Sequence, residues 1–171
     1  RRGMAFTDAL YDGAACLEGV IGRRMSDIFS IRLMLKQHRE IPLAADRFAK
    51  VLEYLRPHVL IDARMNKRSI PERQPGLAPL TIGLGPNFFA GETTDLVVET
   101  AWQSLGRIIE AGASLPLSGE PRPINGHGRE RYVYAPAGGR FETDWKIGAS
   151  VAKGESVARI GDEVIRAPLD G

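Results

Sequence analysis

Helical segments are predicted at three places in the first third of the chain, two from the spacing of apolar residues and the first from Thr7 as a cap and Gly13 as its end. Residues 6–13 predict a short helix, and residues 26–40 predict a longer one that Ser26 is placed to cap. Residues 46–56 show the same apolar spacing and predict a third helix, with Asp46 as its capping residue and a proline directly after it. Each of these segments has one apolar face, so each is expected to pack against other structure.

Extended segments lie between these helical patterns. Residues 16–23 read as one strand, residues 41–45 as a short extended run, and residues 58–64 as a continuous apolar strand. Alternating helices and strands are typical of a parallel sheet covered by helices. The pattern therefore predicts an α/β, Rossmann-like part over residues 1–75.

The pattern changes after residue 75, where glycine and proline separate short apolar runs. Residues 80–85, 95–101 and 106–111 form these runs, and they predict a β-rich region over residues 76–131. Residues 112–132, GASLPLSGEPRPINGHGRERY, contain three prolines and four glycines. This stretch is expected to be an ordered loop or a connection between domains.

The last segment, residues 132–171, contains an internal repeat. APAGGRF at residues 135–141 returns as APLDG at residues 167–171, 32 residues later, with short glycine-punctuated strands between. These turns and the I-G-x-x-V-x-x-G-E-x-V-A pattern resemble half of a biotinyl/lipoyl-type barrel-sandwich hybrid. The resemblance places the hairpin tip at residues 161–163, where Gly-Asp-Glu replaces the carrier lysine. An incomplete module with a structural or protein-binding role is expected.

Composition and charge exclude several classes of protein. The chain is 43% hydrophobic and 26% charged, as in ordinary globular proteins, and no apolar run approaches the ~20 residues of a membrane span. Its net charge is +2, without a dense basic stripe for nucleic acid. The basic pairs Arg1-Arg2, Arg23-Arg24 and Lys67-Arg68 are interpreted as solvated loop charges. A cytoplasmic location is expected, and Cys16 among apolar neighbours is predicted to be buried.

The stretch GLGPNFFAG, residues 83–91, is the most unusual local motif. It fits neither G-x-G-x-x-G nor the P-loop, because Pro86 removes an amide donor and the Lys-Ser/Thr pair is missing. One interpretation is a ligand loop after a strand end. The other is a left-handed turn whose Phe88 and Phe89 fill a core. The candidate ligand-binding residues are Gly83, Gly85, Asn87, Thr93, Thr94, Asp95, Glu99 and Arg129. Of these, Asn87, Thr93, Asp95 and Glu99 are expected to lie near one another.

Glu99 is the first candidate for chemistry. Its apolar neighbours suggest a half-buried carboxylate with a raised pKa, which suits an acid, a base or a ligand. The alternative is an ion pair with Arg64, Arg107 or Arg129. Asp62, at the end of an apolar strand, has a similar status.

His127 is the second candidate, because the glycines on both sides leave its imidazole accessible. It could act as an acid or base, although a lone loop histidine often has no such role. His38 and His58 have no metal-ligand spacing with it, so no metal site is predicted.

Several longer motifs, in order along the chain, carry a wider resemblance. They are HVLIDARMNKR, LAPLTIGLGPNFFAGETTDLVVETAW, LGRIIEAG and SGEPRPINGHGRERYVYAPAGGRF, followed by the repeat described above. Together they resemble the selenium-dependent molybdenum hydroxylase accessory proteins, which are maturation factors associated with enzymes of the xanthine dehydrogenase type. The most specific parts are GLGPNFFAG with VVET, and GHGRER running into APAGGRF.

The resemblance implies an accessory factor that binds a nucleotide or a ligand related to the molybdenum cofactor. Its client would be a molybdenum hydroxylase, and a homo-oligomer is possible. Members usually begin with a GAGDLATG-like loop, so the chain is expected to be the middle of a longer protein. Thr93-Thr94-Asp95 stand where some relatives have an Asp-Cys-His-like run. Two alternatives stay open: a small oxidoreductase or transferase acting on a nucleotide or cofactor through Glu99 or His127, and a structural adaptor.

Overall fold

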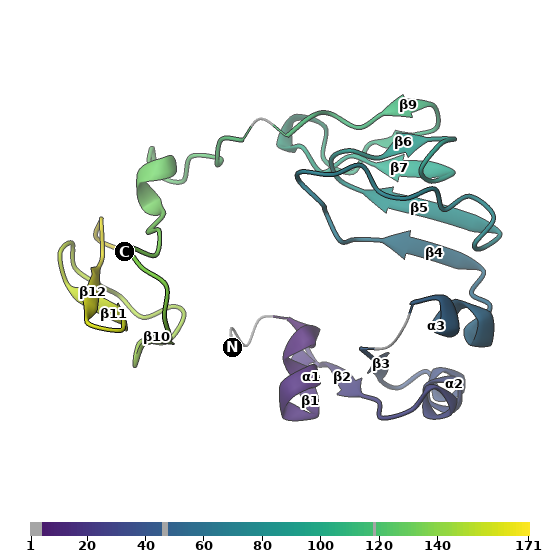
Figure 1. Cartoon of the computed structure of the whole chain (residues 1–171), viewed down its shortest axis with the longest axis horizontal. Coiled ribbons are helices and arrows are strands. Elements are labelled where there is room, and N and C mark those ends of the chain that lie inside the picture. Colours follow the sequence, from purple (N-terminus) through teal and green to yellow (C-terminus); the bar gives the residue numbers. More distant parts are fainter. Residues whose placement is uncertain (1–4, 46–47, 118) are drawn as a thin grey trace. The chain divides into compact units, whose positions relative to one another are not determined.

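The computed structural model describes residues 5–45, 48–117 and 119–171. The chain is a mixed α/β protein that divides into two compact units, Arg1–Leu117 and Ser118–Gly171 (Figure 1). Each unit is described by itself. The predicted divisions at residues 75 and 131 stay predictions.

The helices of the first unit lie where the apolar spacing predicts them. A 3-10 turn η1 (Phe6–Asp8) runs into α1 (Ala9–Asp12), and α2 (Ile28–Gln37) and α3 (Phe48–Leu55) follow. The predicted cap of α2, Ser26, is wrong by one residue: the carboxylate of Asp27 accepts the amide of Ser30 at 2.9 Å. The predicted cap Asp46 and the Arg1-Arg2 pair lie outside the described residues.

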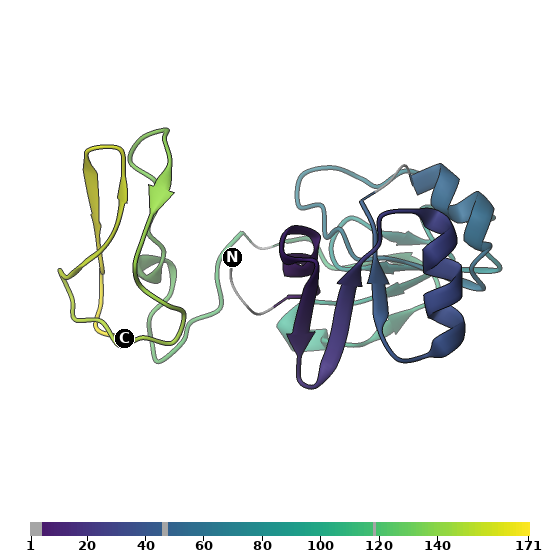
Figure 2. The ribbon, with the colours of Figure 1, turned by 90° about the horizontal axis from the view of Figure 1, so that it is seen from below.

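The first sheet has the order β1-β2-β3, with β1 (Ala14–Leu17), β2 (Val20–Arg24) and β3 (Ile41–Leu43). Figure 2 shows it in purple and blue beside α2. The prediction of one strand over residues 16–23 is wrong, because Glu18 (φ 50°) and Gly19 (φ 81°) form a two-residue hairpin turn. Cys16 lies on the edge strand β1 and is exposed, so its predicted burial is also wrong.

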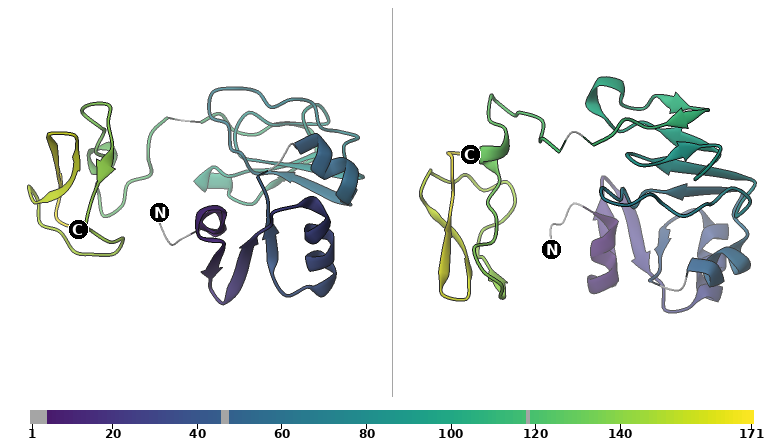
Figure 3. Two further views of the ribbon diagram at one scale, coloured as in Figure 1. Left: turned by 60° about the horizontal axis from the view of Figure 1, so that its bottom comes forward. Right: turned by 45° about the horizontal axis from the view of Figure 1, so that its top comes forward.

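The second sheet contains strands at the positions of the predicted apolar runs. Its order is β4-β5-β7-β8, where β4 (Val59–Asp62), β5 (Leu80–Leu84) and β7 (Leu96–Val98) are parallel and β8 (Ile108–Ile109) is antiparallel (Figure 3). A separate pair joins β6 (Phe89–Ala90) to β9 (Gly112–Ala113). The apolar runs after residue 75 therefore form these strands.

Loops, rather than helices, connect the parallel strands. Residues 63–79 between β4 and β5, and residues 85–95 between β5 and β7, contain no helix. In the second of these loops, Phe88 and Ala90 form a core with Val97 of β7. The predicted helical connection is found in the first sheet, where α2 links the parallel strands β2 and β3, whereas loops link the parallel strands of the second sheet.

The second unit is a small antiparallel sheet preceded by a long loop. A 3-10 turn η3 (Arg129–Arg131) interrupts the loop, and β10 (Phe141–Glu142), β11 (Ser156–Ile160) and β12 (Glu163–Arg166) form the sheet in that order. Ala158, Ile160 and Ile165 make its core. The three strands stay open at both edges and do not close into a barrel.

None of the helices in the described ranges is long and apolar enough to cross a membrane.

Candidate functional site

The loops that follow the three parallel strands meet at Gly85, directly after β5. A Cβ atom at this glycine would lie 3.0 Å from Oγ1 of Thr100, after β7, and 3.4 Å from Cε of Met65, after β4. Open α/β sheets place their ligands outside the carboxyl ends of the strands. This end of the sheet is therefore the candidate site.

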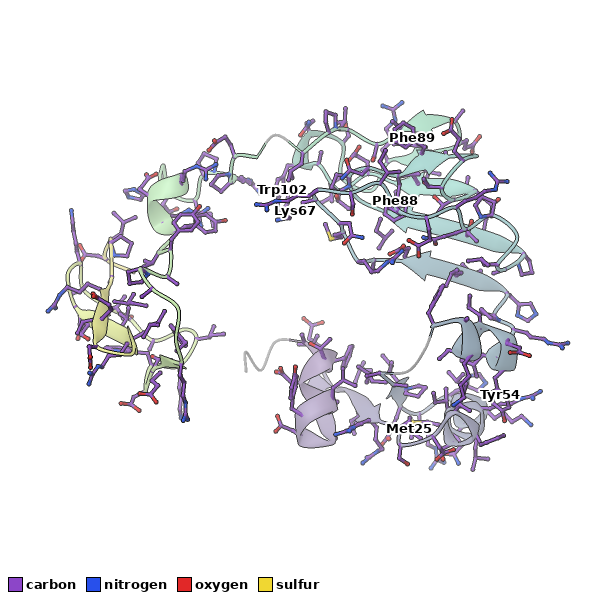
Figure 4. The ribbon with its side chains drawn as sticks, viewed as in Figure 1. Met25, Tyr54, Lys67, Phe88, Phe89 and Trp102 are labelled. Carbon is purple, nitrogen blue, oxygen red and sulfur yellow. The ribbon has the colours of Figure 1, made fainter. Side chains whose placement is uncertain are left out.

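Cationic and aromatic side chains surround this end. Lys67 and Arg68 lie in the loop after β4, and both are exposed. Trp102 begins the 3-10 turn η2 (Trp102–Ser104) after β7 and is 63% exposed. Figure 4 shows Lys67 and Trp102 at the same end of the sheet, beyond the arrowheads of β4 and β5. An ammonium or guanidinium group beside an indole suits a ligand with an anionic group and a flat ring.

The two glycines predicted to bind a ligand have packing roles in the fold. A Cβ on Gly83 would lie 2.2 Å from Cδ1 of Phe88, so the phenyl ring occupies the place of a side chain. Gly85 has φ 92°, a conformation that other residues rarely adopt. Phe88 is 1% exposed and fills the core, whereas Phe89 is only half-buried in β6. The turn interpretation therefore accounts for both glycines.

Thr93 and Thr94 hold the loop between β6 and β7. The hydroxyl of Thr93 accepts the amide of Phe89 at 2.8 Å and also bonds to the Phe89 carbonyl at 3.0 Å. Thr94 donates to the carbonyl of Leu96 at 2.9 Å. Both threonines are buried, so their hydroxyls stabilise the loop.

The expected convergence of Asn87, Thr93, Asp95 and Glu99 is wrong. Asp95 precedes β7 and accepts the amide and hydroxyl of Thr81, both at 2.7 Å, at the amino end of the sheet. Glu99 follows β7 at the carboxyl end, and a strand rises about 3.3 Å per residue, so the two carboxylates lie at opposite ends of the strand. Asn87 lies at the carboxyl end and donates to the carbonyl of Asn66 at 2.9 Å.

The carboxylate of Glu99 is bound by backbone amides. One oxygen accepts the amides of Thr100 and Ala101 at 2.7 and 2.8 Å, and the other accepts that of Leu115 at 2.7 Å. Burial opposes its ionisation, but these donors and the charge of Arg107 hold the pKa of Glu99 below its usual value. The predicted raised pKa is wrong. In the described part of the chain, amides take the place of the expected ion pair.

This arrangement predicts a pH dependence of stability. Because the pKa of Glu99 is lower in the folded state than its usual 4.5, its stabilisation is present above that value. It is lost as the pH falls through the folded pKa. We expect the difference in unfolding free energy between wild type and Glu99→Gln to be largest above about pH 5 and to shrink below it. Urea unfolding measured from pH 7 to pH 3 gives this difference; a constant difference would contradict the assignment.

Asp62, at the carboxyl end of β4, anchors a polar network beside the site. Asp62 accepts hydrogen bonds from the backbone amide of Arg64 at 3.0 Å and from the side-chain amide of Gln74 at 2.6 Å. The guanidinium of Arg64 donates to the carboxylate of Glu72 at 2.8 Å. Burial opposes ionisation of Asp62, but these donors keep its pKa below the usual value. The side-chain oxygen of Gln74, Oε1, is buried and accepts no hydrogen bond in the described part of the chain.

The second unit holds the other two predicted site residues, His127 and Arg129. Nδ1 of His127 lies 3.2 Å from a carboxylate oxygen of Glu130, and the side chain is 49% exposed. Arg129 forms an ion pair with Glu120 at 2.9 Å and donates to the Tyr134 hydroxyl at 3.2 Å. These contacts order the loop, and the accessibility predicted for His127 is confirmed.

Sequence reasoning missed the position of the cations and of the indole. Lys67 and Arg68 are exposed loop charges, as predicted, but the sequence analysis assigns no ligand role to them or to Trp102, although each follows a predicted strand by a few residues. That position after a strand is the signal that could have identified them. Within residues 5–45, 48–117 and 119–171, no three His, Cys, Asp or Glu side chains converge on a possible metal site.

These features define a mixed α/β protein with a cationic and aromatic rim at the carboxyl end of a parallel sheet. No family model matches the chain, and no solved structure matches it. Over 171 aligned residues it is 35% identical to "Uncharacterized protein YqeB" of Escherichia coli strain K12. The alignment covers 98% of the chain and 31% of that relative, so the chain spans about a third of the relative's length.

Proposed function

We propose that the protein is an accessory factor for a molybdenum hydroxylase of the xanthine dehydrogenase type, and that it holds a cofactor-related ligand for its client. The proposal rests on the resemblance carried by GLGPNFFAG, VVET and GHGRER-APAGGRF. The structural observation that supports it is the presence of Lys67 and Trp102 at the carboxyl end of the sheet, with the exposed Arg68 next to Lys67 in the sequence. The hydroxylase is the client, and homo-oligomerisation and a cytoplasmic location belong to the same proposal.

The chemistry of this rim fits the ligand class. A nucleotide and a pterin-based cofactor share a phosphate group and a flat heterocycle, which cations and an indole respectively can bind. Arg64 is already bound by Asp62 and Glu72, so Lys67 and Arg68 are the side chains assigned to the phosphate. In this proposal the ligand is cargo for the client.

A finer description of the fold belongs to the proposal. We propose that the parallel strands β4, β5 and β7 form part of a Rossmann-like sheet, supported by their order and direction. We propose that β10, β11 and β12 form part of a barrel-sandwich hybrid, supported by the A-P-x-x-G repeat that flanks them. In that module Gly161 and Asp162 form the turn between β11 and β12, where a carrier protein has its lysine.

The bonding of Glu99 favours an accessory role over acid-base catalysis at that residue. A general acid or base needs a pKa near the working pH and access to the reacting proton. Glu99 is 2% exposed, its carboxylate is bound by three amides, and its pKa is lowered. These features suit a structural carboxylate.

The ligand assignment predicts a binding result. In a Trp145→Phe background, Trp102 is the sole tryptophan and reports ligand binding by fluorescence quenching. We expect neopterin triphosphate or ATP to quench it, and Lys67→Gln/Arg68→Gln to weaken that binding about tenfold or more by removing two charged contacts. The control is Lys36→Gln/Arg39→Gln, near the end of α2, which keeps wild-type affinity. Equal affinity in the two double variants would contradict the assignment.

A further inference from the structure

A second pocket lies in the first unit, at the amino end of the sheet, away from the proposed cofactor site. Its volume is about 410 Å³, within the range of small-molecule sites. It is formed by the end of α3, the link to β4 and the residues before β5. The lining residues are Leu52, Arg56, Pro57, His58, Gly76, Leu77, Ala78 and Pro79.

The lining combines apolar walls with cationic groups. Leucine, alanine and proline supply the walls, and the proline nitrogens donate no hydrogen bonds. Arg56 and His58 are the ionisable residues of the lining, both are exposed, and no carboxylate is among the lining residues. A pocket of this composition is complementary to a negatively charged group on an apolar body.

Arg56 has an uncommon backbone conformation. It follows the last residue of α3, its amide donates to the carbonyl of Leu52 at 2.9 Å, and its φ is 47°. Glycine is the usual residue in this left-handed position after a helix, because it has no Cβ to strain. The sequence instead places a long cationic side chain there, at the wall of the pocket.

The first unit also contains a matched position. His38 follows α2 with φ 52°, and its amide donates to the carbonyl of Leu35. It has the same left-handed conformation after a helix, but it does not line the pocket. Comparing the two positions separates an effect on helix termination from an effect on the pocket.

We propose that this pocket binds a small amphipathic anion, a carboxylate or phosphate attached to an apolar or aromatic body, with Arg56 binding the charged group. The apolar body lies against Leu52 and Leu77. Pro57 and Pro79 line the same space. The site is independent of the proposed cofactor site, which is at the opposite end of the strands.

The test uses two fluorescent probes that differ in charge. 8-Anilinonaphthalene-1-sulfonate carries an anionic group on an aromatic body, and N-phenyl-1-naphthylamine is its uncharged analogue. We expect Arg56→Gly to weaken binding of the sulfonate about tenfold or more, and to change binding of the amine less than about twofold. Since glycine suits the left-handed conformation, the melting temperature of this variant should stay within about 5 °C of wild type.

His38→Gly is the control, and it should bind both probes as wild type does. Displacement of the sulfonate by benzoate or by phenyl phosphate shows which anion the pocket prefers. The proposal is overturned if wild type does not bind the sulfonate, if Arg56→Gly binds it equally well, or if His38→Gly loses as much affinity. Loss of sulfonate binding in Arg56→Gly but not in His38→Gly supports the proposal. This outcome does not depend on whether Lys67→Gln/Arg68→Gln weakens nucleotide or pterin binding.

Discussion

Replacing Glu99 with alanine is expected to lower the free energy of unfolding of the first unit by about 3–5 kcal/mol. The carboxylate is 2% exposed and accepts the amides of Thr100, Ala101 and Leu115. Alanine would leave these donors without an acceptor in a buried place, where each unsatisfied group costs about 1–3 kcal/mol. Water entering the space would keep the total below the sum of the three.

Urea unfolding checks this value in a Trp145→Phe background, because Trp102 then reports the first unit alone. Glu99→Gln keeps one acceptor oxygen and should lose less stability than the alanine variant. Glu110→Gln is the matched control, since its carboxylate is exposed, and it should change stability by less than about 0.5 kcal/mol. If Glu99→Ala unfolds at the same urea concentration as wild type, the structural role of this carboxylate is wrong.

The Gly83→Ala substitution is expected to lower the free energy of unfolding of the first unit by about 2–3 kcal/mol, because it overpacks the core. Its Cβ would lie 2.2 Å from Cδ1 and 2.4 Å from Cγ of Phe88, and that ring is buried in the core beside Val97. The ring cannot move away without disturbing the sheet, because protein interiors are close-packed. Urea unfolding followed by Trp102 in the Trp145→Phe background measures the loss, and an unchanged urea midpoint would contradict the prediction.

A double-mutant cycle tests the cause of this effect. Phe88→Ala alone should cost about 3–5 kcal/mol by leaving a cavity. In Gly83→Ala/Phe88→Ala the new methyl group no longer meets the ring and fills part of that cavity. The combined loss should therefore be smaller than the sum of the two single losses by about 1 kcal/mol or more. Strict additivity would show that the ring is not the obstacle.

The elements that the sequence predicts correctly depend on local patterns. Apolar spacing located α2 and α3, and the apolar runs located β4, β5 and β7. The alternation of helices and strands predicted a parallel sheet for residues 1–75, and β2 and β3 are parallel on either side of α2, but it gave no direction for β5 and β7. These features are encoded within windows of about 10 to 15 residues, so a single sequence contains their signal.

The features that sequence reasoning missed depend on distant residues or on rare conformations. One of the three amide donors that lower the pKa of Glu99 against the effect of burial comes from Leu115, 16 residues further along the chain. The hairpin turn requires Glu18 at positive φ, which glutamate rarely adopts. Cys16 is exposed because it shares the more exposed face of β1 with Ala14, and which face of a strand is covered depends on tertiary packing.

The candidate site likewise has features that local sequence predicts and features that it does not. The positions of β4, β5 and β7 along the chain were predicted, and general rules for α/β sheets direct attention to the carboxyl end. The position of Asp95 at the opposite end from Glu99 depended on where β7 begins and ends, a difference of a few residues. Such boundaries are the least reliable part of a sequence-based prediction.

The proposed accessory role is tested most directly by the activity of a molybdenum hydroxylase in a strain from which the gene for this protein has been deleted. We predict that xanthine dehydrogenase activity per unit of hydroxylase protein falls about tenfold or more. It should be restored by the wild-type gene and by Lys36→Gln/Arg39→Gln, but not by Lys67→Gln/Arg68→Gln. Unchanged hydroxylase activity in the deletion strain would contradict the proposal.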